Sequence, residues 1–216
     1  DLHRRRHSFP TRRSSDLAGA DLDWMRRAAG YTEAQNLEDA NKLAAMLKGI
    51  YRSKKPVIAR IHGAALAGGT GLTAVCDIAV ATDAARFALT EVRLGLIPAT
   101  IGPYVADAIG WRQARRYFLS AERIDAATAL RIGLVEEVVA KGSARDAALV
   151  LADKVGRQSP VAVSACKTLV QRARHAPPAA NLIHERELFV QLFDSEDQRE
   201  GVNAFLEKRA PVWKNA

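Results

Sequence analysis

The sequence is poor in cysteine and has no long hydrophobic run. Its 216 residues include two cysteines, Cys76 and Cys166, and both stand among apolar neighbours. This argues against a disulfide framework and predicts a reducing, cytoplasmic environment. Neither cysteine has a partner at the spacing of a metal site, and no apolar run reaches the roughly 20 residues that a membrane-spanning helix needs. We therefore expect neither a bound metal nor a membrane partner.

Acidic residues are outnumbered by basic ones. Lysine and arginine together number 32 against 24 aspartates and glutamates, which gives a formal net charge of +8. Such an excess suits binding to nucleic acid, to an anionic membrane or to a polyanionic small molecule. Nucleic acid is disfavoured, because neither a recognition motif nor an interleaving of aromatic and basic residues accompanies the charge. The hydrophobic share, 48%, suffices for one main domain with a sizeable core.

Residues 1–17 differ in composition from the rest of the chain. They hold five arginines against two aspartates, with several serines, no apolar period and no apolar centre of the kind found in a secretory signal. A mitochondrial presequence has a similar composition. The segment also resembles translated sequencing-adapter read-through, and we favour this interpretation. We expect residues 1–17 to be a non-native, artefactual leader and exclude them from the predicted fold.

The segment from Ala64 to Leu72 is rich in glycine. It follows an apolar run, Val57–Ile61, and has glycines at 68, 69 and 71. Glycines where a strand turns into a helix let a ligand approach backbone N–H groups directly, and N–H groups that face a carbonyl oxygen stabilise an oxyanion. A tight packing contact between a helix and a sheet gives the same pattern. The glycines alone leave both interpretations open.

The remaining pattern alternates strands and helices and ends in a helical region, which is typical of an α/β fold. Asn36 is the predicted N-cap of the first helix, and Asp125 caps a helix that Gly133 ends. From Ser143 onward the pattern is helical. Strands are predicted over 57–61, 78–81, 86–89 and 135–139, helices over 37–50 and 68–75, and breaks in the helical region at 177–178 and 194–195.

Three blocks carry a family resemblance. They are Ala18–Leu22 (Ala-Gly-Ala-Asp-Leu), the glycine-rich segment and Phe87–Pro98. In this order and spacing they resemble the crotonase (enoyl-CoA hydratase/isomerase) superfamily, from about Ala18 to the C-terminus. The resemblance implies a crotonase-like α/β fold with a ββα spiral over 18–142 and a helical trimerisation region over 143–216. Family members normally carry strands before the first block, so it also implies an N-terminally incomplete chain with the first strands missing.

The resemblance implies an acyl-CoA site in a homotrimer or hexamer. It assigns the oxyanion hole to the backbone N–H groups of Ala20 and Gly68, and the catalytic carboxylate to Glu91. Because the coenzyme A thioester is itself the substrate, no cofactor is expected, and its phosphates account for a modest basic excess. The further substrate-binding positions that the resemblance implies are Ala18, Asp21, Leu22, Ala67, Gly71, Pro98 and Lys208.

Each assignment has a structural alternative. Ala20 is an ordinary loop alanine in that alternative, Glu91 a solvated glutamate at a strand end beside Arg93, and Lys208 a solubilising residue at a helix end. A carboxylate in an apolar cleft would instead have a raised pKa and could pass a proton at neutral pH. Lysine at 208 would suit binding to a phosphate of coenzyme A. In this family the coenzyme A concerned is often the one bound by a neighbouring subunit.

One position departs from the family pattern. Typical hydratases of the family carry a second glutamate three residues after the oxyanion glycine, where this chain has Gly71. Three interpretations remain within the family: a hydratase that holds water with another acid or with the substrate's own carboxylate, a double-bond isomerase that uses Glu91 alone, and an inactive remnant. Outside the family, a basic RNA-binding protein remains, supported mainly by residues 1–17.

Further blocks favour hydration of a particular substrate class. Ile101–Tyr104, Arg115–Tyr117 and Gly201–Trp213 look like bacterial methylglutaconyl-CoA hydratases of leucine breakdown, and equally like isohexenylglutaconyl-CoA hydratases of acyclic terpene breakdown. Both substrates bear a distal carboxylate, which needs a cationic or hydrogen-bonding partner. The predicted function is hydration of a 3-substituted glutaconyl-CoA. Candidates for the carboxylate's partner are Arg93, Arg115 and His62, with solvated surface arginines as the alternative.

Overall fold

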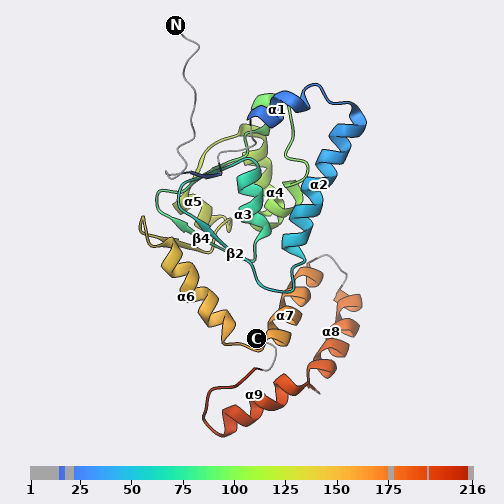
Figure 1. Cartoon of the computed structure of the whole chain (residues 1–216), viewed down its shortest axis with the longest axis vertical. Helices are drawn as coiled ribbons and strands as arrows, with labels where there is room; N and C mark the ends of the chain where they lie inside the picture. Colours follow the sequence, from blue (N-terminus) through green and yellow to red (C-terminus); the bar gives the residue numbers. More distant parts are fainter. Residues whose placement is uncertain (1–14, 18–21, 175–177, 194, 214–216) are drawn as a thin grey trace.

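Two small sheets form the centre of the molecule. The computed structural model describes residues 15–17, 22–174, 178–193 and 195–213, and Figure 1 shows how their helices surround the strands. One sheet has the order β2-β4-β7, with β2 (Ile58–Ile61), β4 (Ile78–Thr82) and β7 (Glu137–Val139) all parallel. The other has the order β1-β3-β5-β6, with β1 (Ser15–Leu17), β3 (Ala64–Leu66), β5 (Arg86–Ala88) and β6 (Ile124–Asp125).

The chain passes twice from the first sheet to the second and then into a helix. β2 leads to β3 and the helix α3 (Gly68–Val75), and β4 leads to β5, a short 3-10 helix (Glu91–Leu94) and α4 (Gly102–Ser120). Because β3 and β5 pair in parallel, each repeat enters its helix from the same edge of the sheet. This is the predicted strand-strand-helix repeat, and the predicted strands over 57–61, 78–81 and 86–89 are confirmed with boundaries shifted by one residue.

Residues 15–17 take part in the second sheet. β1 runs parallel to β3, with Leu17 opposite Ala65. The final three residues of the segment we excluded from the fold therefore belong to a strand. The rest of that segment lies outside the described residues, so its foreign origin stays a prediction.

The core lies between the two sheets and the helices that cover them. Phe87 of β5, Ile124 of β6 and Leu47 of α2 (Glu33–Tyr51) are almost completely buried. Burial of one such side chain contributes about 1.5–3 kcal/mol. Val80 and Ala81 of β4 are equally inaccessible, which explains why β4 is apolar along its length rather than alternating.

The helix α2 begins earlier than predicted. Thr32 is its N-cap: the Thr32 hydroxyl accepts a hydrogen bond from the Gln35 N–H (3.3 Å), and the Gln35 side chain accepts one from the Thr32 N–H (2.9 Å). The prediction that Asn36 caps this helix is wrong, because Asn36 lies inside the first turn and its backbone N–H donates to the Thr32 carbonyl. A reciprocal capping box stabilises the start better than a single side chain.

Two helices were not predicted. α1 (Leu22–Ala28) precedes α2, and α4 packs across α3. α4 contains Pro103 in its first turn and Gly110 at φ 77°, a kink inside the helix. Pro103 is compatible with the first turn, whereas Gly110 argues against a continuous helix, and packing of the buried residues of α4 against α3 offsets that preference.

The second half of the chain follows the predicted pattern. Asp125 caps α5 (Ala126–Arg131) by accepting a hydrogen bond from the Thr128 N–H (2.8 Å), and Gly133 follows at φ 81°. α6 (Ala144–Gly156) packs against β2 and β4. The final helices, α7 (Pro160–Ala173), α8 (Pro178–Phe193) and α9 (Glu196–Leu206), confirm the predicted helical region. Of the predicted breaks, Pro177 and Asp194 lie outside the described residues.

A buried ion pair fastens α7 to the sheets. The Lys167 ammonium lies 2.7 Å from Asp77 Oδ2, and the Lys167 side chain is 7% exposed. Asp77 also accepts a hydrogen bond from the Val57 N–H (2.7 Å), just before β2. Beyond α7 the chain leaves the core, and Figure 1 shows α8 and α9 at the end of the molecule away from α1.

Candidate active site

The site is built where β3 and β5 end side by side. Leu66 pairs with Ala88, and the N–H of Ala67 donates to the Ala88 carbonyl (2.7 Å). Gly68 follows β3 by two residues and Glu91 follows β5 by three. Parallel pairing therefore brings the predicted oxyanion glycine and the predicted catalytic carboxylate to one edge of the sheet.

The backbone turns sharply before α3. Ala67, the N-cap, has φ 49° and ψ −116°, a conformation that residues with a Cβ rarely adopt. No carbonyl of the described residues accepts a hydrogen bond from the Gly68 N–H, and a Cβ added to Gly68 would meet nothing within 4 Å. An open N–H at the positive end of a helix is suited to a developing negative charge. Strain of this kind often accompanies functional sites.

Thr70 holds this turn in place. Its side chain is fully buried, and its hydroxyl lies 2.8 Å from the Ala65 carbonyl and 3.1 Å from the Ala88 carbonyl. The hydroxyl thus connects the start of α3 with both β3 and β5. Sequence reasoning did not select Thr70, because a threonine in a helix gives no sign of which strands its hydroxyl will reach.

Glu91 occupies a desolvated position at the start of the 3-10 helix. Burial raises the pKa of its carboxyl group. One carboxyl oxygen, Oε2, is buried and has no hydrogen-bond partner. The guanidinium of Arg93, close to Glu91 in the sequence, donates a hydrogen bond to the Ala121 carbonyl (2.7 Å). A partly buried carboxyl with one unpartnered oxygen and a raised pKa is a good candidate for a general acid or base.

Position 71 is closed by a neighbouring side chain. Gly71 is buried on the first turn of α3, and a Cβ placed there would lie 2.2 Å from Ile101 Cγ2. Ile101 is 2% exposed and is the N-cap of α4. Pro98 is also buried, and its carbonyl accepts a hydrogen bond from the Gly102 N–H (2.7 Å). Gly71 therefore contributes close packing between α3 and α4.

Some predicted site residues cannot be joined to this edge. Ala18, Ala20 and Asp21 lie outside the described residues, and Leu22 begins α1. Lys208 follows α9 at φ 54° and is exposed, while Figure 1 places α9 far along the long axis from α3. Within one chain, Lys208 and Glu91 do not meet. The roles of these residues stay predictions.

The candidates for a distal carboxylate partner are dispersed. Arg93 is engaged with Ala121, Arg115 is exposed on α4, and His62 follows β2 at the end of the other sheet. His62 lines an open pocket of about 670 Å³ together with Arg60, Lys141 and Arg145. The structure does not bring these three candidates together.

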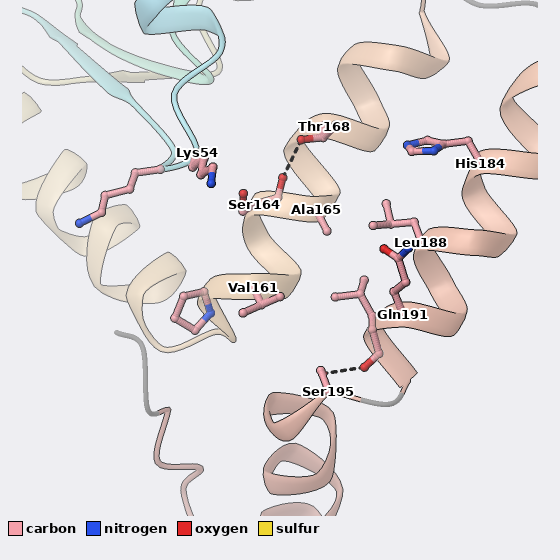
Figure 2. Close-up of a pocket in the computed structure, with 12 residues that line it drawn as sticks. Lys54, Val161, Ser164, Ala165, Thr168, His184, Leu188, Gln191 and Ser195 are labelled. Carbon is pink, nitrogen blue, oxygen red and sulfur yellow. Dashed lines mark hydrogen bonds between the residues drawn. The ribbon is translucent and has the colours of Figure 1, made fainter.

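A separate groove lies between α7 and α8. Its volume is about 590 Å³, and Figure 2 shows Val161 and Ala165 of α7 facing Leu188 of α8 across it, with Lys54 at one side and His184 near its rim. None of the predicted site residues lines this groove. It is an apolar hollow distinct from the edge that holds Glu91.

Comparison with known proteins gives the family. A model described as enoyl-CoA hydratase/isomerase matches residues 17–216. The chain belongs to the enoyl-CoA hydratase/isomerase family. It is 38% identical over 199 residues to 2,3-dehydroadipyl-CoA hydratase of Escherichia coli K12, covering 91% of this chain and 76% of that protein.

Solved structures show the same fold. DspI of Pseudomonas aeruginosa has a TM-score of 0.88 and 45% identity, covering 94% of this chain and 77% of its own. An enoyl-CoA hydratase from Shewanella pealeana has a TM-score of 0.88 and 40% identity, covering 94% and 76%. The predicted crotonase-like fold is therefore confirmed, and the chain is an enzyme of the hydratase/isomerase family with an acyl-CoA substrate.

Two further features are absent from the described residues. No helix among them combines the length and apolar character needed to cross a bilayer. Nor do three or more histidine, cysteine, aspartate or glutamate side chains gather there as metal ligands would.

Burial raises the pKa of the Cys76 thiol to about 11, so this cysteine is a thiol at neutral pH.

Proposed function

We propose that the enzyme adds water across the double bond of an enoyl-CoA whose acyl chain carries a distal carboxylate, such as a 3-substituted glutaconyl-CoA. The observation that carries the proposal is that the open N–H of Gly68 and the partly buried carboxyl of Glu91 lie at the same edge of the sheet. A thioester oxygen at Gly68 would gain negative charge as the water oxygen attacks C3. The second N–H of the oxyanion hole is assigned to Ala20.

Glu91 handles the proton in this scheme. Its ionised carboxylate takes a proton from water as the new C3–O bond forms, and the enolate is held by the N–H groups. The protonated carboxyl then returns the proton to C2 as the enolate collapses, so that one water is added and Glu91 ends ionised. A raised pKa favours both halves, because it brings the two protonation states of Glu91 closer in free energy near neutral pH. Removal of one oxyanion donor typically costs about 2.7–4 kcal/mol.

The substrate class is supported from outside the site as well. The relative from Escherichia coli is named for a dehydroadipyl thioester, an acyl chain with a second carboxylate. Without the +3 of residues 1–17 the chain still carries a formal net charge of +5, which suits a substrate that carries both this carboxylate and the phosphates of coenzyme A. The methylglutaconyl and isohexenylglutaconyl thioesters belong to the same chemical class.

The assembly is proposed to be a homotrimer or a hexamer. α8 and α9 expose large apolar side chains, among them Phe189, Phe193 and Phe205, each more than half exposed. Apolar surface of this extent is typical of an interface. In such an assembly, Lys208 of one subunit could meet the coenzyme A bound by another, which the distance within one chain forbids.

A second candidate function is isomerisation of the double bond. It is favoured by the packing of Ile101 against Gly71, which leaves no room for a second carboxyl group at position 71. In the described part of the site, Glu91 then supplies the carboxyl group. Moving a double bond needs one group that removes a proton from C4 and returns it to C2. It needs no bound water.

One experiment separates the two reactions. The enzyme is incubated with 3-methylglutaconyl-CoA in H₂¹⁸O, enoyl absorbance is followed, and the product is analysed by mass spectrometry. Hydration predicts loss of absorbance and one ¹⁸O atom in the product. A shifted double bond with no ¹⁸O would establish isomerisation, and an unchanged substrate that nevertheless binds would reject this acyl chain.

A further inference from the structure

The space on the two sides of the oxyanion turn differs sharply. Gly68 and Gly71 are three residues apart on α3 and so share one helix face. A Cβ on Gly68 would meet nothing within 4 Å, whereas one on Gly71 would lie 2.2 Å from Cγ2 and 2.5 Å from Cβ of Ile101. Real Cβ atoms do not approach so closely. Ile101 therefore excludes every side chain from position 71.

The fold keeps Ile101 in this position from both ends. Its carbonyl accepts a hydrogen bond from the Val105 N–H (3.1 Å) at the start of α4, and the adjacent Gly102 N–H donates to the Pro98 carbonyl. Val105 is fully buried and Ile101 is 2% exposed. Because α3 and α4 pack on each other here, Ile101 cannot move aside without moving α4.

The consequence concerns the attacking water. A side chain at 71 would lie one helical turn from the thioester oxygen, close enough to orient water for attack on C3. Isoleucine offers hydrocarbon instead, and hydrocarbon holds no water. We infer that Ile101 is a specificity-determining residue. Because its side chain fills the space at position 71, no protein side chain can orient the water from there. Hydration then depends on the distal carboxylate of the substrate, which orients the water. This inference rests on the proposed hydration.

Two substrates isolate the distal carboxylate. 3-Methylcrotonyl-CoA differs from 3-methylglutaconyl-CoA only in lacking that group. The wild-type enzyme is expected to show a kcat/KM at least 100-fold higher for 3-methylglutaconyl-CoA, expressed mainly in kcat. In the double variant Gly71→Glu with Ile101→Gly, the new glutamate carboxylate takes the space of the Ile101 side chain. We expect the ratio to fall at least 10-fold, through a gain on 3-methylcrotonyl-CoA.

The claim that Ile101 leaves no room for a side chain at position 71 is tested by thermal stability. Alanine in place of a helical glycine ordinarily stabilises a helix, but Gly71→Ala should lower the melting temperature here, and Ile101→Gly should relieve that loss in the double variant. Ile109 of α4 is also buried (5% exposed) and provides the control: Ile109→Ala should relieve nothing. Additive effects of Gly71→Ala and Ile101→Gly would overturn the steric claim.

The outcomes distinguish the inference from the proposed function. Equal wild-type kcat/KM for the two substrates would overturn the dependence on the distal carboxylate while hydration stands. No ¹⁸O incorporation from either substrate would overturn the proposed hydration itself, and the inference with it. A ratio that stays unchanged in a folded double variant would show that Ile101 does not set the specificity.

Discussion

At the scale of single residues, the site depends on a few atoms in unfavourable surroundings. Ala67 holds a positive φ, the Gly68 N–H lacks an acceptor among the described residues, and Glu91 Oε2 is buried without a partner. Each of these is destabilising alone, and their meeting at one sheet edge is what an enzyme site requires. The sequence predicted Gly68 and Glu91 from the family resemblance. It could not predict Ile101, because the contact with Gly71 joins residues thirty positions apart.

The strain at Ala67 gives a stability prediction. Ala67→Gly should stabilise the protein by about 1 kcal/mol, because glycine adopts this conformation without a Cβ clash. Urea unfolding would measure the gain. Ala121, with φ 49° at the end of α4, is the matched control: Ala121→Gly should give a similar gain without affecting turnover. A loss of stability in Ala67→Gly would contradict the assignment of strain.

The partly buried carboxyl of Glu91 gives a pH prediction. Burial raises its pKa in the folded state, so folding is opposed by ionisation. The penalty is absent below the unfolded pKa, grows as pH rises through the folded pKa, and is constant above it. Glu91→Gln should therefore melt at a higher temperature than the wild type at pH 8, with the difference shrinking towards about pH 4. A difference independent of pH would contradict a raised pKa.

At the scale of elements, local sequence patterns predicted the helices, strands and caps that depend on neighbouring residues. The helix over 68–75, the strands of both repeats and the cap at Asp125 all follow from nearby residues. The start of α2 was misplaced although Thr32 and Gln35 have the spacing of a capping box, a pattern that would have found it. α4 was missed because Gly110 interrupts it and because it owes its stability to packing.

The ion pair between α7 and Asp77, the residue before β4, gives a prediction at this scale. Lys167→Met would leave Asp77 in a mostly buried position without its cation, and should destabilise the protein by about 3 kcal/mol. Thermal unfolding would measure it. The exposed pair of Lys42 and Glu38 on α2 is the control, and Lys42→Met should have no measurable effect. Equal effects of the two substitutions would refute the role of Lys167 in fastening α7.

At the scale of the whole molecule, the last helices stand apart from the core. The core and the edge with Glu91 are formed within the chain, whereas α8 and α9 extend from it with apolar side chains exposed (Figure 1). The family resemblance implied a helical trimerisation region here. Local sequence patterns alone predicted the helices but not that they leave the core, because an apolar helical face looks the same whether it meets its own core or another subunit.

The assembly is testable by sedimentation. We expect the protein to sediment as a trimer or hexamer, and Phe189→Asp with Phe193→Asp to shift it towards monomer, since both rings are more than half exposed on α8. Leu119→Asp, at a 78% exposed position on α4, is the control and should leave the assembly intact. A wild-type monomer at micromolar concentration would contradict the proposed assembly.

The central claim is that Glu91 transfers the proton. Its most direct test is the rate of ¹⁸O incorporation into 3-methylglutaconyl-CoA by Glu91→Gln, beside the wild type and Glu122→Gln, whose carboxylate pairs with Arg116 at the surface. We predict that Glu91→Gln loses at least 100-fold in kcat while remaining folded, and that Glu122→Gln keeps wild-type turnover. A folded Glu91→Gln with undiminished kcat would contradict the account.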